Sequence, residues 1–199
     1  MPKPSNSAMA FELSVAVFDA CILYPFRLRN IIIQAAVDRL VDGRWTNQIH
    51  DEWMRTLAAD APAIPFERLQ STRRLMNDAL PDATVIGYED RISTISLPDP
   101  DDRHVVAAAI AAGASVVPTW NLRDFPPAAL KKFGLRRQTP DAFLADLYDR
   151  APVLMVGSLG NARRNLNKSR VSVPEFLDIL QNQKLGQLAK RVRKNLTDL

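Results

Sequence analysis

The chain has 199 residues, of which 47% are hydrophobic and 24% are charged, a balance that indicates a globular protein with a sizeable core and excludes global disorder. Its one cysteine, Cys21, cannot form an intramolecular disulfide, and no apolar run approaches the roughly 18 residues that a membrane helix needs. Residues 1–10 also lack the pattern of a secretory signal, so we expect a cytoplasmic protein with no membrane partner.

Charge is distributed unevenly along the chain. Residues 1–150 contain 17 basic and 19 acidic side chains, whereas residues 151–199 contain nine basic and three acidic ones. The basic C-terminal segment is compatible with a polyanionic partner, and it is equally compatible with a helical tail whose charges are solvated.

The N-terminal part predicts a strand followed by a helix. Residues 13–18 form a nearly continuous apolar run that ends at Asp19, which is typical of a central parallel strand covered on both faces. Residues 28–41 have apolar positions at helical spacing, and Gly43 then supplies a stop signal.

Two helices and a short strand are predicted next. Thr46 or Asn47 can cap a helix whose apolar side chains recur every fourth position. A second helix is expected over residues 66–79, and residues 83–87 are a candidate strand.

The clearest helix signal lies over residues 97–112. Asp99 can cap this helix, Pro100 fits its first turn, and an alanine-rich run extends to Gly113. We therefore expect the positive end of the helix dipole to lie close to several carboxylates at this point of the chain.

Two strand signals complete the pattern. Residues 114–118 predict a strand and residues 135–137 an edge strand, after which Thr139 and Pro140 open another helix. Strands that alternate with helices imply a parallel sheet, because parallel neighbours need crossover connections. The predicted fold class is a three-layer α/β/α domain with a parallel central sheet, followed by a C-terminal helical extension.

Only helical signals occur beyond Arg150. Ser172 and Glu175 form a candidate capping box, and the last helix has an apolar stripe beside a basic one. The stripe consists of Leu185, Leu188, Val192 and Leu196, and the basic residues are Lys190, Arg191, Arg193 and Lys194. The basic residues could hold RNA, or the stripe could dock on the domain or on a partner, and we favour docking. The chain is thus divided into a flexible N-terminus (1–11), a main domain (12–150) and a basic extension (151–199).

Four carboxylates are candidates for a site. Asp19 and Asp124 follow predicted strands, and ligands collect at the carboxyl ends of the strands in an open α/β sheet. Asp102 lies at the start of the alanine-rich helix, and Glu52 lies beside a buried helical stripe. If they converge they imply a metal, because hard oxygen ligands suit Mg²⁺ or Mn²⁺. Taken singly, each has an alternative as a cap, turn or surface residue.

Four segments together resemble the PIN domain in order, spacing and surroundings. They are VFDACILYP (17–25), DEWMRTL (51–57), DPDDRHVVAAA (99–109) and TWNLRDF (119–125), and the resemblance covers about residues 12–148. The proline that follows Leu23 and Tyr24 in the first motif and the DPDDRH form of the third are similar to those of the VapC-like toxins of bacterial toxin–antitoxin pairs. Cys21 departs from the Asn or Thr of many members, and the helical extension lies outside the minimal domain.

The resemblance implies an endoribonuclease that hydrolyses RNA phosphodiesters with Mg²⁺ or Mn²⁺. It places Asp19, Glu52, Asp102 and Asp124 in the catalytic and metal site. Glu52 either binds the metal directly or acts through a bound water. Within the third motif it favours Asp102; Asp99 then serves as the cap, and Asp101 ranks second. His50 and His104 are interpreted as ordinary helix residues, since no motif links them to a nucleophile.

Substrate and partners also follow from the resemblance. Asn121 and Thr119 are expected to orient Asp19 or the scissile phosphate, and Arg27, Arg29 and Arg103 to contact the RNA backbone, with a solvated surface role as the alternative for the arginines. A cognate antitoxin protein is the expected partner, and a homodimer is one option for assembly. The alternative functions are a housekeeping RNA-processing nuclease and a non-catalytic nucleic-acid-binding module. An aspartyl phosphatase is disfavoured because Cys21 stands where its second Asp would be.

Overall fold

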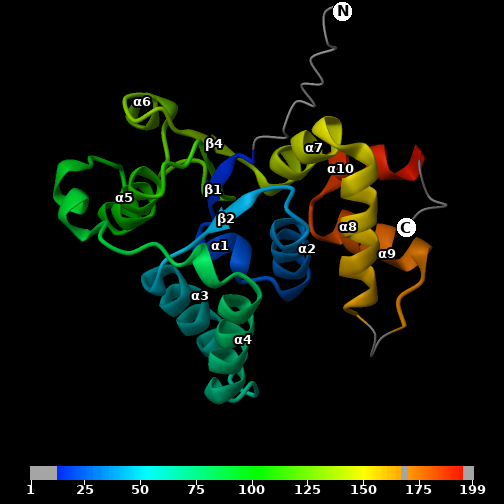
Figure 1. The fold of residues 1–199 in the computed structure, drawn as a ribbon. Coiled ribbons are helices and arrows are strands. Elements are labelled where there is room, and N and C mark those ends of the chain that lie inside the picture. Colours follow the sequence, from blue (N-terminus) through cyan, green and yellow to red (C-terminus); the bar gives the residue numbers. More distant parts are fainter. Residues whose placement is uncertain (1–12, 167–169, 195–199) are drawn as a thin grey trace, which may run out of the picture.

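A computed structural model describes residues 13–166 and 170–194 of the chain. Four short strands form one sheet in the order β2-β1-β3-β4, and every neighbouring pair is parallel (Figure 1). The strands are β1 (Val15–Val17), β2 (Asp42–Arg44), β3 (Val116–Pro118) and β4 (Arg136–Gln138). The predicted parallel sheet is therefore confirmed, and its two central strands, β1 and β3, are those that precede Asp19 and Thr119.

Helices and short 3₁₀ turns connect the strands. The α-helices are α1 (Ala20–Leu23), α2 (Phe26–Val37), α3 (Asn47–Asp60), α4 (Phe66–Ala79), α5 (Arg103–Ala111), α6 (Pro127–Lys131), α7 (Pro140–Arg150), α8 (Pro152–Arg164), α9 (Val173–Asn182) and α10 (Gly186–Val192). The 3₁₀ turns are η1 (Pro81–Ala83), η2 (Glu89–Thr94) and η3 (Pro100–Asp102). Among the described residues, none of these helices combines the length and apolarity needed to cross a membrane.

The sheet is covered on both faces, as its apolar strands require. On one face, the ring of Phe18 packs edge-on against Phe143 of α7 at 6.2 Å, with Ala36 of α2 close by. On the other face α5 packs against β1 and β3, and Figure 1 shows it on the opposite side of the strands from α2 and α7. The three-layer α/β/α arrangement is thus confirmed.

Gly43 does not end a helix, as its position in the sequence suggested. The preceding helix stops earlier, at Val37, and Gly43 lies inside β2. A Cβ on Gly43 would come within 2.5 Å of the Phe18 ring, so the close approach of β2 to the core needs a residue without a side chain. The strand β2 was therefore missed because its glycine resembles a helix stop.

The strand predicted over residues 83–87 is reduced to a single bridge. Thr84 pairs with Trp45, whose backbone N–H donates to Ala83 O at 3.0 Å and whose carbonyl accepts from Val85 N at 2.8 Å. Gly87 then has a φ of 70°, a left-handed conformation that does not continue an extended strand. The prediction of a full strand here was wrong.

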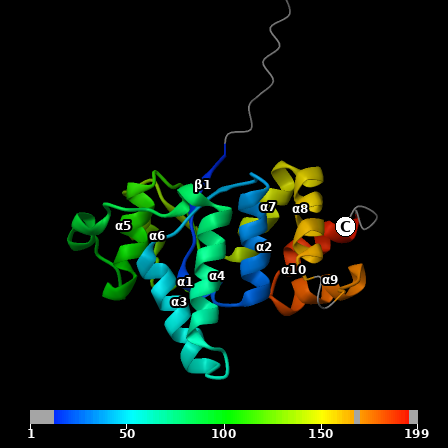
Figure 2. The ribbon, with the colours of Figure 1, turned by 60° about the horizontal axis from the view of Figure 1, so that its bottom comes forward.

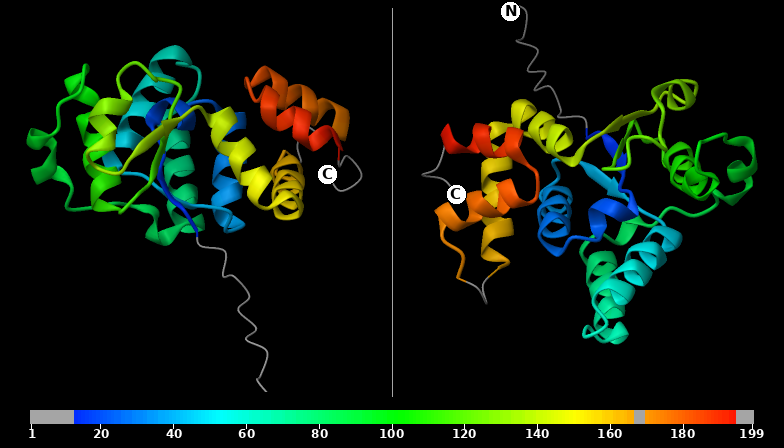
Figure 3. Two further views of the ribbon diagram at one scale, coloured as in Figure 1. Left: turned by 90° about the horizontal axis from the view of Figure 1, so that it is seen from above. Right: turned by 180° about the vertical axis from the view of Figure 1, so that it is seen from behind.

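The C-terminal helices pack against the sheet domain. Figures 2 and 3 show α8, α9 and α10 gathered beside α2 and α7, and Asn30 of α2 donates to Ala162 O of α8 at 2.7 Å. The buried carboxylate of Asp141 in α7 accepts from the backbone N–H groups of Gln187 and Leu188, both at 3.0 Å, and so caps the start of α10.

The apolar stripe of the extension faces inward. Leu188 and Val192 are fully buried, whereas Lys190 and Lys194 are exposed. The predicted capping box at Ser172 is present at the start of α9, and Leu196 lies outside the described residues. The extension therefore docks on the domain through this stripe.

Candidate active site

The carboxyl ends of β1 and β3 bring two polar side chains together. Backbone bonds continue the sheet just beyond its strands, from Asp19 N to Pro118 O and from Thr119 N to Gln138 O. The Thr119 hydroxyl consequently reaches the Asp19 carboxylate and donates to its Oδ2 at 2.5 Å. Both residues are buried, so Asp19 is fixed in position by the geometry of the sheet.

Cys21 supports the same carboxylate. Its thiol donates to Asp19 Oδ2 at 3.0 Å, and its sulfur accepts from Trp120 N at 3.3 Å. Burial, followed by the charge of Asp19, raises the pKa of the Cys21 thiol to about 12. Cys21 is therefore a protonated donor at neutral pH. It stands where many members of the family have Asn or Thr, and its thiol supplies a hydrogen bond to Asp19 from that position.

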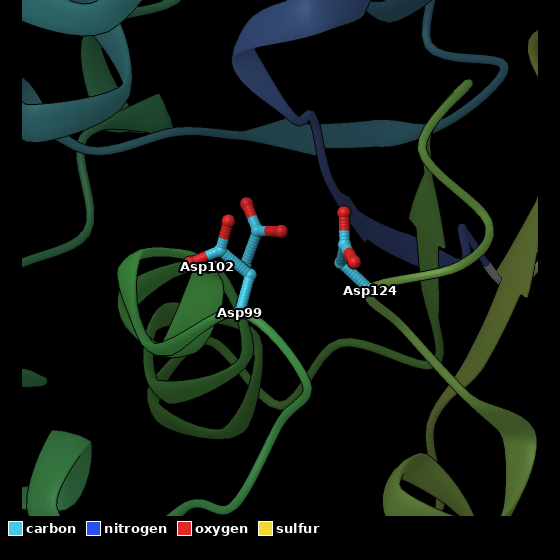
Figure 4. A group of neighbouring side chains, drawn as sticks. All are labelled: Asp99, Asp102 and Asp124. Atoms are coloured by element: carbon cyan, nitrogen blue, oxygen red, sulfur yellow. The ribbon is translucent and has the colours of Figure 1, made fainter.

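Asp99, Asp102 and Asp124 form a tight group of carboxylates. Each offers one oxygen, and these atoms all lie within 4.8 Å of one another. Figure 4 shows Asp99 and Asp102 projecting side by side from the turn η3, just before α5, toward the space that Asp124 faces from the loop after β3. Asp101 is exposed and lies outside this group.

Asp99 combines two roles of which the sequence predicted one. Its Oδ1 accepts from Asp101 N at 2.9 Å, which confirms it as the cap of the turn η3. It also joins Asp102 and Asp124, which was not foreseen. A signal existed, since residues three apart in a helical turn lie on one face.

The negative charge of Asp19 acts on Asp102 together with the charges of the other two clustered acids. Partial burial first, and then the charges of Asp19, Asp99 and Asp124, together raise the pKa of Asp102 to about 7, while His104 acts in the opposite direction. Asn121 donates to Asp102 Oδ2 at 3.2 Å. A group of carboxylates that repel one another at this distance is a place where a cation would be strongly attracted.

Glu52 stands at the wall of the site and is not one of the three clustered acids. It lines a cavity of about 480 Å³ together with Asp19, Asp102 and Asn121. Its Oε1 lies 2.8 Å from Nε2 of His104, which is buried in α5. This contact explains the position of Glu52 and gives His104 a place beside the site that its sequence context did not reveal.

The three predicted arginines differ in environment. Arg27 is exposed, and Arg103 is partly buried at the start of α5. Arg29 is buried: it donates to Leu23 O at 2.6 Å, and its guanidinium lies 4.7 Å from the centre of the Trp53 ring. Nη1 of Arg29 thus holds the end of α1, and contact of the three arginines with RNA stays a prediction.

A second hollow of about 400 Å³ lies beside β2, away from the acids. The charged side chains of Asp42 and Arg44 on its wall pair with each other at 2.7 Å.

Comparison with known families agrees with this geometry. The family described as PIN domain matches residues 15–123, a range that includes Asp19, Glu52 and Asp102. The chain belongs to the PIN-domain family. A second family, described as VapC50 C-terminal domain, matches residues 140–194 of this PIN protein.

One relative of this PIN protein is described as "Putative ribonuclease VapC50", from Mycobacterium tuberculosis (strain ATCC 25618 / H37Rv). It is 40% identical over 72 residues, which are 36% of this chain and 42% of the relative. The alignment thus spans less than half of the relative's length. No solved structure matches the chain.

The second family match begins at Pro140, the first residue of α7. That helix lies inside the unit predicted as 12–150, and it contacts both α8 and α10. The division into units at residues 11 and 150 stays a prediction.

Proposed function

We propose that this PIN protein is a metal-dependent endoribonuclease that uses Mg²⁺ or Mn²⁺. The observation that carries the proposal is the convergence of Asp99, Asp102 and Asp124, whose oxygens lie within 4.8 Å of one another, with Asp19 close enough for its charge to act on Asp102. A purely binding module has no reason to gather acids that repel both one another and the RNA backbone. An enzyme that uses a divalent cation needs such carboxylates, because they bind the cation.

The residues present suit such an ion. Asp99, Asp102 and Asp124 can each supply one oxygen, and Asp19 lies near enough to raise the pKa of Asp102. Carboxylate oxygens are the ligands that Mg²⁺ and Mn²⁺ prefer. When bound, the ion would lower the pKa of an attacking water and neutralise charge on the phosphate.

The surrounding side chains have supporting roles. Thr119 and Cys21 hold Asp19, and Asn121 holds Asp102. Glu52, placed by His104, is positioned to accept a hydrogen bond from a water in the cavity. In this assignment no side chain acts as a nucleophile.

A toxin of a toxin–antitoxin pair is the biological role that we propose. It is supported by the relative described as a VapC50 ribonuclease and by the match of residues 140–194 to the C-terminal domain of the same name. The partner is then a small antitoxin protein that silences the site. Growth arrest on induction, relieved by the neighbouring gene product and by Asp19→Asn, would support this role, and normal growth would favour RNA processing instead.

The activity is tested by incubating single-stranded RNA with the purified protein in EDTA, Mg²⁺ or Mn²⁺. We expect cleavage with either metal and its loss in Asp102→Asn and Asp124→Asn. Asp51→Asn is a matched control, because Asp51 is exposed on α3 and pairs with Arg73 outside the cavity. Cleavage at the wild-type rate by both Asp102→Asn and Asp124→Asn would refute the proposal.

A further inference from the structure

The acidic cavity continues past the carboxylate cluster. Its far part is lined by Tyr24 from just beyond α1 and by Thr56 and Asp60 from α3. Glu52, Thr56 and Asp60 are spaced four residues apart, so they follow one face of α3 away from the cluster. The cavity of about 480 Å³ therefore extends along α3 beside the proposed site of cleavage.

Tyr24 and Asp60 are joined at this end of the cavity. The Tyr24 hydroxyl donates to Asp60 Oδ2 at 2.9 Å. No basic side chain among residues 13–166 and 170–194 forms an ion pair with Asp60. Asp60 is thus an uncompensated carboxylate whose orientation is set by the Tyr24 hydroxyl.

A phosphate would be repelled by Asp60, whereas a base with N–H donors would be attracted. The Watson–Crick edge of guanine presents two adjacent donors, N1–H and the N2 amino group, that match the two oxygens of a carboxylate. Adenine and cytosine place an acceptor beside their amino group, and uracil places acceptors on both sides of its one N–H. A carboxylate in this position can therefore pair with guanine through two hydrogen bonds and with none of the other three bases in the same way.

Tyr24 supplies the other part of a base site. Its side chain is only partly buried, and it lines the same cavity as Asp60. Unpaired bases stack on aromatic side chains, and this contact is tolerant of base identity. Stacking on Tyr24 would hold a base at the cavity wall, and Asp60 would select it.

We propose that Tyr24 and Asp60 form a recognition subsite for an unpaired guanine next to the scissile phosphate. The subsite deepens the proposed ribonuclease function and rests on it. It predicts that the chain cuts single-stranded RNA beside guanine and has no such preference without the Asp60 carboxylate.

The test compares short single-stranded RNAs that carry guanine, inosine or adenine at one position, the other positions being uridine. Inosine lacks only the N2 amino group, so we expect roughly a tenfold lower rate than for guanine, and a larger loss with adenine. Asp60→Asn should bring the three rates within about threefold of one another, since an amide offers one acceptor in place of two. Tyr24→Phe keeps the stacking ring, so it should bind RNA more tightly than Tyr24→Leu does.

Binding of the same RNAs to Asp102→Asn separates this inference from the proposed function. Tighter binding of the guanine RNA, lost when Asp60→Asn is added, supports the subsite even if the wild type cleaves nothing. Cleavage by the wild type at equal rates for guanine, inosine and adenine overturns the subsite and leaves the nuclease intact. Asp51→Asn is again the control on α3 and should keep the wild-type preference; equal loss of preference in Asp51→Asn and Asp60→Asn would also overturn it.

Discussion

The Thr119 hydroxyl donates to Asp19 Oδ2 at 2.5 Å across a separation of 100 residues in the sequence. The bond joins the ends of β1 and β3, which are hydrogen-bonded neighbours in the sheet. The position of Asp19 is therefore set by the pairing of these two strands.

Loss of the Thr119 hydroxyl should impair cleavage more than folding. Thr119→Val leaves Asp19 without its shortest hydrogen bond, and we expect RNA cleavage to fall by at least tenfold with about 1–3 kcal/mol lost in stability. Thr119→Ser keeps the hydroxyl and should retain most activity. Cleavage rates and urea denaturation measure the two effects, and equal activity of the Val and Ser variants would show that the bond does not matter for the reaction.

Stability of the metal-free protein should fall as pH rises from about 4 to 7. Folding raises the pKa of Asp102 from 3.8 to about 7, mainly through burial and then through its acidic neighbours. In this window the folded state holds more protons than the unfolded state, so the free energy of unfolding decreases with pH. Because Asp102 is only half buried, we expect an effect of about 1–2 kcal/mol after solvent screening.

Asp102→Asn should therefore raise the melting temperature in EDTA at pH 7.5 and flatten its dependence on pH between 4 and 7. Thermal unfolding followed by circular dichroism measures both. The same pH slope in the variant and the wild type would mean that Asp102 is not the group responsible.

His104 should act on the reaction through Glu52. Its Nε2 lies 2.8 Å from Glu52 Oε1, and the ring is 2% exposed, so its removal frees the Glu52 carboxylate to move. We expect His104→Ala to lower the rate of cleavage about as much as Glu52→Gln does, with little further loss in the double variant. His104→Gln, which can place an amide donor near Nε2, should recover part of the rate; fully additive losses would show that the two residues act separately.

Asp141 should hold the C-terminal helices on the domain. It accepts from the first N–H groups of α10, from Gln187 and Leu188, so Asp141→Ala removes a cap and leaves these donors unsatisfied. We expect a loss of about 1–2 kcal/mol in stability and faster proteolysis after residue 166. Asp178→Ala, a substitution of an exposed residue on α9, is the control. Limited trypsin should digest this variant at the same rate as the wild type.

More of the fold than of the site could be predicted from the sequence. The helix over residues 66–79 and the capping box at Ser172 were predicted correctly, because caps and periodicity are local signals. The strand β2 was not predicted, because the role of Gly43 depends on its contact with Phe18, 25 positions away. Local patterns do not encode such a contact.

In the site, too, local signals could be recognised in the sequence and contacts between distant residues could not. Asp19, Asp102 and Asp124 follow a strand, open a helix and lie in the loop after a strand, and their assignment to one site came from the resemblance of these segments to PIN motifs. The pairing of His104 with Glu52 joins two helices, α5 and α3, that are far apart in the sequence, and Arg29 is buried by the end of α1 and by Trp53. These placements follow from tertiary packing, which overrides the local preference of charged residues for the surface.

The central claim, that the clustered carboxylates bind a divalent ion, is tested most directly by titrating Mn²⁺ into the protein and following free Mn²⁺ by electron paramagnetic resonance. We predict saturable binding to the wild type and to Asp51→Asn, weakened at least tenfold in Asp102→Asn and in Asp124→Asn. Equal affinity in all four proteins, or no saturable binding to the wild type, would contradict the account.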